Sequence, residues 1–165
     1  MKLESLHDLY ISELRDLYSA EDQIVRALPK VIENVTSPEL RQALEDHLEE
    51  TREQVARLEQ VFEMHGEESR KQKCKGMQGV LAEGEEMIGH DAPPAVRDAA
   101  IISACQRVEH YEIAAYGSVR TYAEELGQER AAALLQQTLD EEMAADEKLS
   151  DIAGSRVNIE ATRHA

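Results

Sequence analysis

Aromatic residues are scarce in this sequence: they make up 4% of its 165 residues, with no tryptophan and one phenylalanine. Strands are enriched in aromatic side chains, so this scarcity argues against a fold built on sheets. Alanine, leucine, glutamate, glutamine and arginine are abundant instead, and these residues favour helices. The composition therefore predicts an all-α protein, and a chain of this length is large enough for one domain with a substantial core.

Basic residues and long apolar runs are also in short supply. Lysine and arginine number 18 against 34 acidic residues, which gives a net charge of −16. This balance argues against binding to nucleic acid and to anionic membrane surfaces. No apolar run approaches the ~20 residues that a membrane-spanning helix requires, and the N-terminal residues, with Glu4 and Asp8, lack the pattern of a secretion signal. We therefore predict a cytoplasmic protein.

The sequence contains two cysteines, Cys74 and Cys105, which lie far apart and form no Cys-x-x-Cys motif. In a cytoplasmic protein such isolated cysteines are expected to be reduced thiols. Two cysteines cannot supply the four thiolates of an iron–sulfur or rubredoxin-type site. Any electron donor that the protein uses would therefore be another molecule.

Apolar residues at heptad spacing predict four long helices, over residues 3–35, 38–65, 94–126 and 128–153. Ser37 and Pro38 give the start signal of the second helix. Glycines follow the last three helices, at Gly66, Gly127 and Gly154. The sequence thus predicts a bundle domain over residues 1–154. Residues 155–165 show no periodicity and are expected to form a mobile tail.

Residues 66–92 form a connection that is long for two helices of one bundle. Apolar residues over 76–88 predict a short fifth helix lying across the bundle. A connection of this length can return the chain to the end from which it started. The second and third long helices are therefore expected to run parallel, as in ferritin-type bundles.

Carboxylates interrupt the apolar stripes of all four long helices. An ionised carboxylate in a core costs several kcal/mol unless it is paired or bound to a metal, so these positions require a reason. Glu109 and Glu112, three residues apart between Cys105 and Tyr116, are the clearest case. The full set of acids on the stripes is Glu21, Glu50, Glu109, Glu112, Glu142 and Asp146.

Each of these six acids lies close to the midpoint of its helix. In a bundle of helices of similar length the midpoints share one level, and at ~1.5 Å per residue an offset of three residues is only about 5 Å. Six carboxylates at one level need counter-charge, which two divalent cations would largely supply. Oxygen ligands suit Fe, Mn, Mg or Ca. A single such glutamate more often reaches solvent, but the joint pattern indicates a metal site.

Some assignments stay open at this point. Glu141 is the rival of Glu142, and Glu53 is the rival of Gln54, although the heptad register favours Glu142 and Gln54. His47 and Gln54 are candidates for orienting Glu50, but a satisfied histidine at the edge of the core is the better interpretation of His47. Tyr18 and Tyr116 lie within reach of carboxylates, yet core packing explains them better.

Five segments of the sequence resemble the YciE/YciF-type ferritin-like proteins. They are Asp16–Glu21, His47–Thr51, Cys74–Met77, Val108–Glu112 and Thr138–Glu142. The resemblance covers roughly residues 3–153. It implies a ferritin-like four-helix bundle, dimeric in most members, with a rubrerythrin-like dinuclear metal site and a role in the bacterial stress response.

The sequence departs from the general di-iron pattern at both Glu-x-x-His positions. Glu50 is followed three residues later by Glu53, and Glu142 by Ala145. The leading hypothesis is a dinuclear iron or manganese protein that acts on peroxide, dioxygen or Fe(II). The alternatives are a metal-buffering protein without turnover and a purely structural helical dimer. A homodimer is expected in each case, and the apolar residues Leu6, Leu9 and Ile11 would offer a surface to the partner subunit.

Overall fold

The computed structural model describes residues 3–70 and 72–164, and within these ranges the chain forms helices and no strands. All five predicted helices are present, with ends within three residues of the predicted ones. They are α1 (Leu6–Glu33), α2 (Pro38–Met64), α3 (Lys75–Ile88), α4 (Pro94–Glu125) and α5 (Glu129–Ile152). The all-α prediction is therefore confirmed.

Local signals set the helix ends. The Ser37 side chain accepts a hydrogen bond from the backbone N–H of Leu40 at the start of α2, and Pro38 is the first helical residue. Gly66 and Gly127 follow α2 and α4 with φ of 64° and 69°. This left-handed conformation favours glycine, which has no Cβ, so both glycines end their helices as the sequence predicts.

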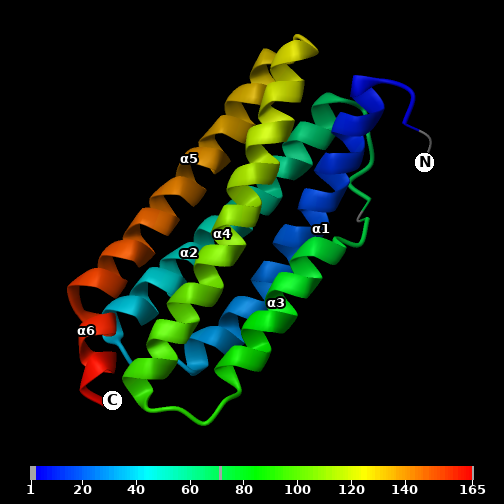
Figure 1. The fold of residues 1–165 in the computed structure, drawn as a ribbon. Coiled ribbons are helices and arrows are strands. Elements are labelled where there is room, and N and C mark those ends of the chain that lie inside the picture. The colour runs from blue at the N-terminus through cyan, green and yellow to red at the C-terminus, as the bar shows by residue number, and fades with distance from the viewer. Residues whose placement is uncertain (1–2, 71, 165) are drawn as a thin grey trace.

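The four long helices close into a ring: α1 packs against α2 and α4, and α5 packs against the same two helices. In Figure 1, α1 and α5 run in one direction, while α2 and α4 run in the other. The connection after α2 passes back along the outside of the bundle with α3, which packs on α1 and α4. The predicted parallel course of the second and third long helices is therefore confirmed.

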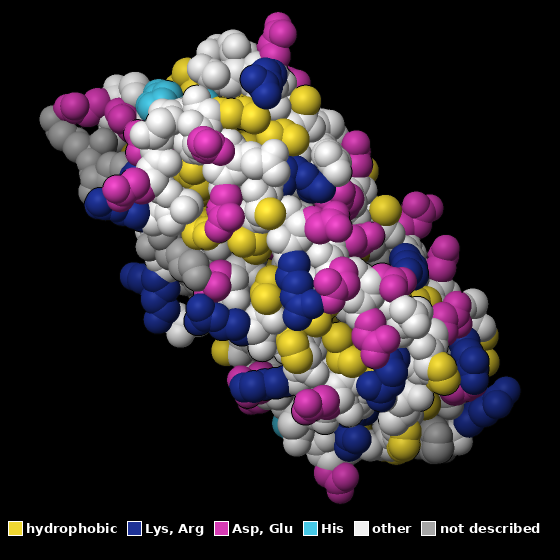
Figure 2. Space-filling model, turned by 180° about the vertical axis from the view of Figure 1, so that it is seen from behind, with side chains coloured by type: hydrophobic (Ala, Val, Ile, Leu, Met, Phe, Trp, Pro, Cys, Tyr) yellow, Lys and Arg dark blue, Asp and Glu magenta, His cyan; other side chains and the backbone are white. Residues whose placement is uncertain are grey.

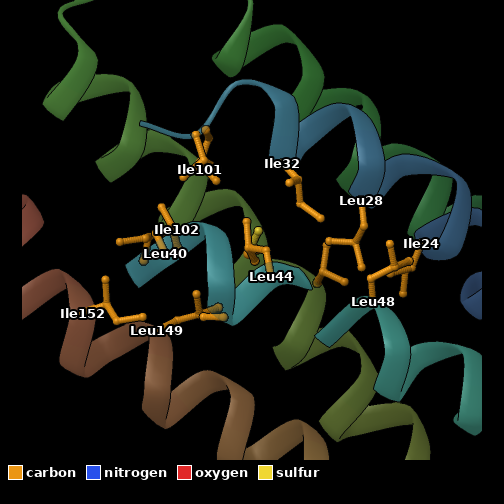
Figure 3. Packing of buried hydrophobic residues seen from close by; sticks show 14 of the residues in the cluster. Ile24, Leu28, Ile32, Leu40, Leu44, Leu48, Ile101, Ile102, Leu149 and Ile152 are labelled. Atoms are coloured by element: carbon orange, nitrogen blue, oxygen red, sulfur yellow. The ribbon is translucent and has the colours of Figure 1, made fainter. Parts of the chain in front are cut away.

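The core consists of two apolar clusters separated by a polar layer. The first cluster includes Ile24, Leu28, Leu44, Ile102 and Leu149, and Figure 3 shows these side chains pointing toward one another from α1, α2, α4 and α5. The second cluster, toward the other end of the bundle, includes Tyr10, Leu14, Phe62, Val119 and Leu135. Each long helix contributes to both clusters, so the middle of the bundle is enclosed by apolar side chains at both ends.

Helical structure continues beyond Gly154, where the sequence analysis ended the last helix. Residues Ala153–Val157 form a π-helical turn, and α6 (Asn158–Ala161) and a 3₁₀ turn (Thr162–His164) follow. Val157 is 2% exposed and joins the first apolar cluster. The segment after Gly154 is thus helical, and the buried Val157 side chain holds it against the bundle. This contact could not be predicted from residues 155–165, because they show no apolar periodicity. The mobility of the segment stays a prediction.

The surface is strongly acidic, in keeping with the net charge of −16. Figure 2 shows acidic side chains spread over the face opposite to that of Figure 1, with basic ones scattered among them. Across the described residues, no helix combines the length and the apolar character that crossing a membrane requires.

A close contact fixes α3 to the bundle. The Tyr111 hydroxyl of α4 lies 3.1 Å from the Cys74 sulfur, at the N-terminus of α3, and donates to Asp16 of α1 at 3.2 Å. A Cβ built on Gly76 would lie 2.6 Å from Cε2 of the Tyr111 ring. Glycine at position 76 therefore permits this approach, and the tyrosine links three helices.

Substituting this glycine is expected to weaken the protein. Gly76→Ala should lower the free energy of unfolding by about 1–3 kcal/mol, because the tethered Tyr111 ring has to shift. Gly79→Ala is the matched control on the same helix: its Cβ would meet nothing within 4 Å, so alanine should raise stability by up to ~1 kcal/mol through helix propensity. Urea unfolding followed by circular dichroism measures both. Equal effects of the two substitutions would contradict the proposed role of the contact.

Candidate metal centre

Four buried side chains from three helices meet in the polar layer. His47 of α2, Glu109 and Glu112 of α4 and Glu142 of α5 each offer one ligand atom, and these atoms lie within 4.8 Å of one another. The spacing on α4 explains part of this, since residues three apart lie on the same face of a helix. Three of the six acids predicted from the sequence are thus brought together, and their role as ligands stays a prediction.

Glu21 of α1 adjoins this group. Its side chain is fully buried, and its Oε1 accepts a hydrogen bond from the Tyr116 hydroxyl of α4. Burial, followed by the negative charge of Glu142, raises the pKa of Glu21 to about 8, although the Tyr116 hydrogen bond acts in the opposite direction. Tyr116 therefore does reach a carboxylate, a role that the sequence analysis placed below core packing.

The other buried carboxylates of α4 resist ionisation as well. Burial raises the pKa of Glu109 and of Glu112 well above the ordinary range, and the charges of Glu142 and Glu21 add to the effect on both. A group of this kind must take up either protons or cations. The polar layer therefore favours the binding of positive charge, as protons or as metal cations.

Unpartnered polar atoms concentrate in the same place. Buried atoms without a hydrogen-bond partner include both ring nitrogens of His47, both carboxylate oxygens of Glu112, and one oxygen each of Glu21, Gln54, Glu109 and Glu142. An unsatisfied buried polar atom costs about 1–3 kcal/mol. The donor set of carboxylate oxygens and imidazole nitrogen fits a hard or borderline divalent cation, which would satisfy many of these atoms at once.

A second group of side chains holds the carboxylates in place. Gln54 donates from Nε2 to Glu142 Oε1 and, at 3.2 Å, to Glu141 Oε2. Arg57 donates to both oxygens of Glu141, at 2.8 and 2.9 Å, and to Thr138 Oγ1 at 2.6 Å. Partial burial favours a higher pKa for Glu141, but the hydrogen bonds from Arg57, Gln137 and Gln54 outweigh it and lower the pKa.

These contacts show which residue of each pair, Glu141 or Glu142 and Glu53 or Gln54, points into the bundle. Glu142 is buried in the centre while Glu141 is paired with Arg57, and Gln54 is buried while Glu53 is exposed. The heptad register therefore chose the inward-facing residue in both cases. Tyr18, the other tyrosine considered, donates to Glu59 at 2.6 Å.

Glu50 does not lie where the sequence analysis expected it. Its side chain is 50% exposed, and its Oε2 lies 3.9 Å from His47 Nδ1. At 3.6 residues per turn, position 50 is rotated by about 60° from position 47, away from the line on which Thr51 and Gln54 are buried. The expectation of a buried Glu50 is wrong, because the broad apolar stripe of α2 is centred on His47 and its neighbours.

Asp146 also differs from the other acids. Its side chain is 22% exposed and lies 3.3 Å from His110 Nε2, and it accepts from Gln106 Nε2 at 3.1 Å. Protein donors thus occupy Asp146 one turn beyond Glu142, outside the group of four. His47, and neither Glu50 nor Asp146, lies beside Glu109, Glu112 and Glu142. The sequence feature that could have indicated this is the position of His47 on the buried face of α2, one turn before Thr51.

Comparison with known proteins agrees with this fold. A family model described as "Domain of unknown function (DUF892)" matches residues 5–162. Protein YciF of Escherichia coli (strain K12) is 45% identical over 166 residues, which cover 100% of both chains. The resemblance noted in the sequence is therefore confirmed over the full length.

Solved structures give the same result. The crystal structure of the E. coli stress protein YciF has a TM-score of 0.90 and 46% identity, covering 94% of this chain and 98% of that chain. YcfI from Rhodopseudomonas palustris, provisionally described as a structural protein, has a TM-score of 0.89 and 44% identity, covering 90% of this chain and 95% of that chain. The chain is therefore a member of the DUF892 family of YciF-type proteins.

Proposed function

We propose that this protein binds two divalent cations, iron or manganese, inside a ferritin-like four-helix bundle and acts on peroxide, dioxygen or Fe(II) during stress. The observation that carries the proposal is the meeting of His47, Glu109, Glu112 and Glu142, each of which has at least one buried nitrogen or oxygen atom without a hydrogen-bond partner. Together with Glu21 the site has four carboxylates, and two divalent cations would offset their four charges.

The helix arrangement supports the ferritin-like part of the proposal. The closed ring of four helices and the parallel course of α2 and α4, reached through a long connection, match the crossover that ferritin-like folds use. The relative named YciF is described as a stress protein, which supports the stress role. The two free thiols, Cys74 and Cys105, support a reducing, cytoplasmic location.

The side chains of the chain prepare the site for this chemistry. His47 and the three acids would bind the cations, while Gln54 orients Glu142 and Tyr116 orients Glu21 through hydrogen bonds. The two apolar clusters exclude bulk water from the site along the axis of the bundle. Iron or manganese bound there would supply the electrons that reduction of an O–O bond requires.

A cavity gives small neutral molecules access to the site. It has a volume of about 770 Å³, lies between α1, α3 and α4, and reaches His47 and Glu109. Its walls are largely apolar, with Leu28, Leu81 and Val108 among them. Dioxygen or peroxide can approach through such a cavity, which supports a reaction rather than storage alone.

Anaerobic loading followed by addition of peroxide tests the proposal. We expect protein purified without chelator to contain iron or manganese by mass spectrometry, and metal-free protein to take up two ions per chain. Rapid loss of peroxide after loading would support turnover. Loading without peroxide loss would favour a metal-buffering protein, and uptake of less than one ion per chain would contradict both.

A structural role is the second candidate, favoured by the provisional description of YcfI as a structural protein. In that case the metal-free protein should be as stable as the loaded one.

A homodimer is proposed under every alternative, as the resemblance implies. Leu6 is 38% exposed and is available to a partner, whereas Ile11, 3% exposed, packs inside its own chain and drops out of the predicted partner surface.

A further inference from the structure

A second cavity leads to the same centre from the opposite wall of the bundle. It has a volume of about 510 Å³ and lies between α2 and α5. Small side chains, including Ala133, Ala144 and Ala145, leave the space open on the α5 side. Five of the residues that line it are acidic and one, Lys148, is basic, so this cavity attracts cations.

The inner end of this acidic cavity is part of the candidate metal centre. His47 and Glu109 line it, and they are 5% and 2% exposed. Neither ring nitrogen of His47 has a hydrogen-bond partner, and Nε2 lies 3.5 Å from Glu109 Oε1. Unpartnered ligand atoms therefore face a cation that arrives from this side.

Glu50 lies between the surface and these buried atoms. Its side chain is 50% exposed, and its Oε2 is 3.9 Å from His47 Nδ1. Asp46 and Asp140 are exposed residues of the same lining, and Asp46 pairs with Lys148 at 3.3 Å. Glu50 thus combines exposure to solvent with a short distance to the inner group, which it reaches through His47.

The two cavities differ in what they admit. The larger one, between α1, α3 and α4, reaches His47 and Glu109 along an apolar wall that includes Ile24, Leu28 and Val108. A divalent cation that enters an apolar passage loses hydration without gaining new ligands, which is costly. The acidic cavity replaces water ligands with carboxylate oxygens at each step.

We propose that the cavity between α2 and α5 is the route by which divalent cations reach the metal centre, with Glu50 as the transient outer ligand that passes each ion to His47. The inference rests on the proposed function, since it presumes that the centre binds cations. It gives Glu50 a kinetic role outside the final ligand set, and it gives Ala145 a role in keeping the passage open.

Stopped-flow uptake of Co²⁺ and Mn²⁺ by the metal-free full chain tests this route. Glu50→Gln combined with Asp140→Asn should lower the association rate constant about 5- to 10-fold, within the range of electrostatic steering. Ala145→Leu should slow uptake comparably without any change of charge, and the number of ions bound at saturation should stay the same. Glu33→Gln combined with Glu85→Gln is the matched control, because it removes two charges at the lining of the apolar cavity.

The possible outcomes distinguish a failure of the proposed entry route from a failure of the proposed metal-binding function. Slowing by the α2–α5 variants alone supports the route. Equal slowing in the control, which would report only the total charge, overturns it, as does unchanged uptake in all variants. A wild-type chain that takes up neither ion overturns the proposed function together with the route.

Discussion

Glu112→Gln is expected to reduce the uptake of Fe(II) or Mn(II) from two ions to less than one ion per chain. Glu112 is fully buried, the charges of Glu142, Glu21 and Glu109 act on it, and neither of its oxygens accepts a hydrogen bond from a donor among the described residues. The amide keeps the shape of the side chain but provides a much weaker ligand than a carboxylate. Anaerobic loading, gel filtration and mass spectrometry of the bound metal measure the result.

The same substitution should stabilise the metal-free protein. Removing a buried carboxylate that has no partner is expected to raise the free energy of unfolding at neutral to alkaline pH by about 1–3 kcal/mol. If Glu112→Gln binds less metal while its metal-free form is more stable than the wild type, Glu112 contributes to metal binding and not to folding. Glu53→Gln is the control, since Glu53 is exposed on α2 beside Gln54, and it should change neither quantity. Full metal uptake by Glu112→Gln would remove Glu112 from the ligand set.

The stability of the metal-free protein should fall as the pH rises, and metal should reverse this trend. The pKa of Glu21 is about 8 in the folded chain, against an ordinary value of 4.5. The folded state therefore favours the protonated acid, so its contribution is complete below pH 4.5 and is lost as the pH rises through 8. A rise of this size corresponds to roughly 5 kcal/mol, which urea unfolding at a series of pH values would detect.

Bound cations invert the dependence because they require the ionised carboxylates. Protons compete with metal at low pH, so the loaded protein should gain stability from about pH 5 to pH 8. Glu21→Gln is the control for the metal-free series: it removes one of the buried acids and should make the loss of stability with pH smaller, leaving the part that Glu109, Glu112 and the net charge cause. A slope unchanged by Glu21→Gln would show that general charge repulsion, and not the centre, causes the loss.

Local features of the sequence were sufficient for the helices and for the directions of two of them. Ser37 and Pro38 start α2, and Gly66 and Gly127 end α2 and α4, because capping and positive φ depend on residues close in sequence. The length of the connection after α2 was sufficient to predict the parallel course of α4. The tail after Gly154 was not predictable in this way, because burial of Val157 depends on a distant surface.

Some residues of the candidate centre could likewise be predicted from the sequence, and others could not. Heptad register placed Glu109, Glu112 and Glu142 inside, because a stripe defines a face of each single helix. It misjudged Glu50 and His47, which lie on neighbouring lines of α2, because the exact rotation of that helix is set by its packing against α1 and α5. It also gave no sign of Arg57, which binds Glu141 and Thr138 of α5.

By itself the sequence determined that four amphipathic helices carry acids at their midpoints, and so that negative charge collects at one level of an apolar bundle. Periodicity is a property of each helix alone, and for that reason it can be read from the chain. Only the tertiary structure decided that an imidazole, His47, faces three of these acids while Glu50 and Asp146 turn to solvent and to protein donors. The rotation of each helix about its axis depends on all its neighbours together, and a rotation of about 60° is enough to exchange one residue for the other.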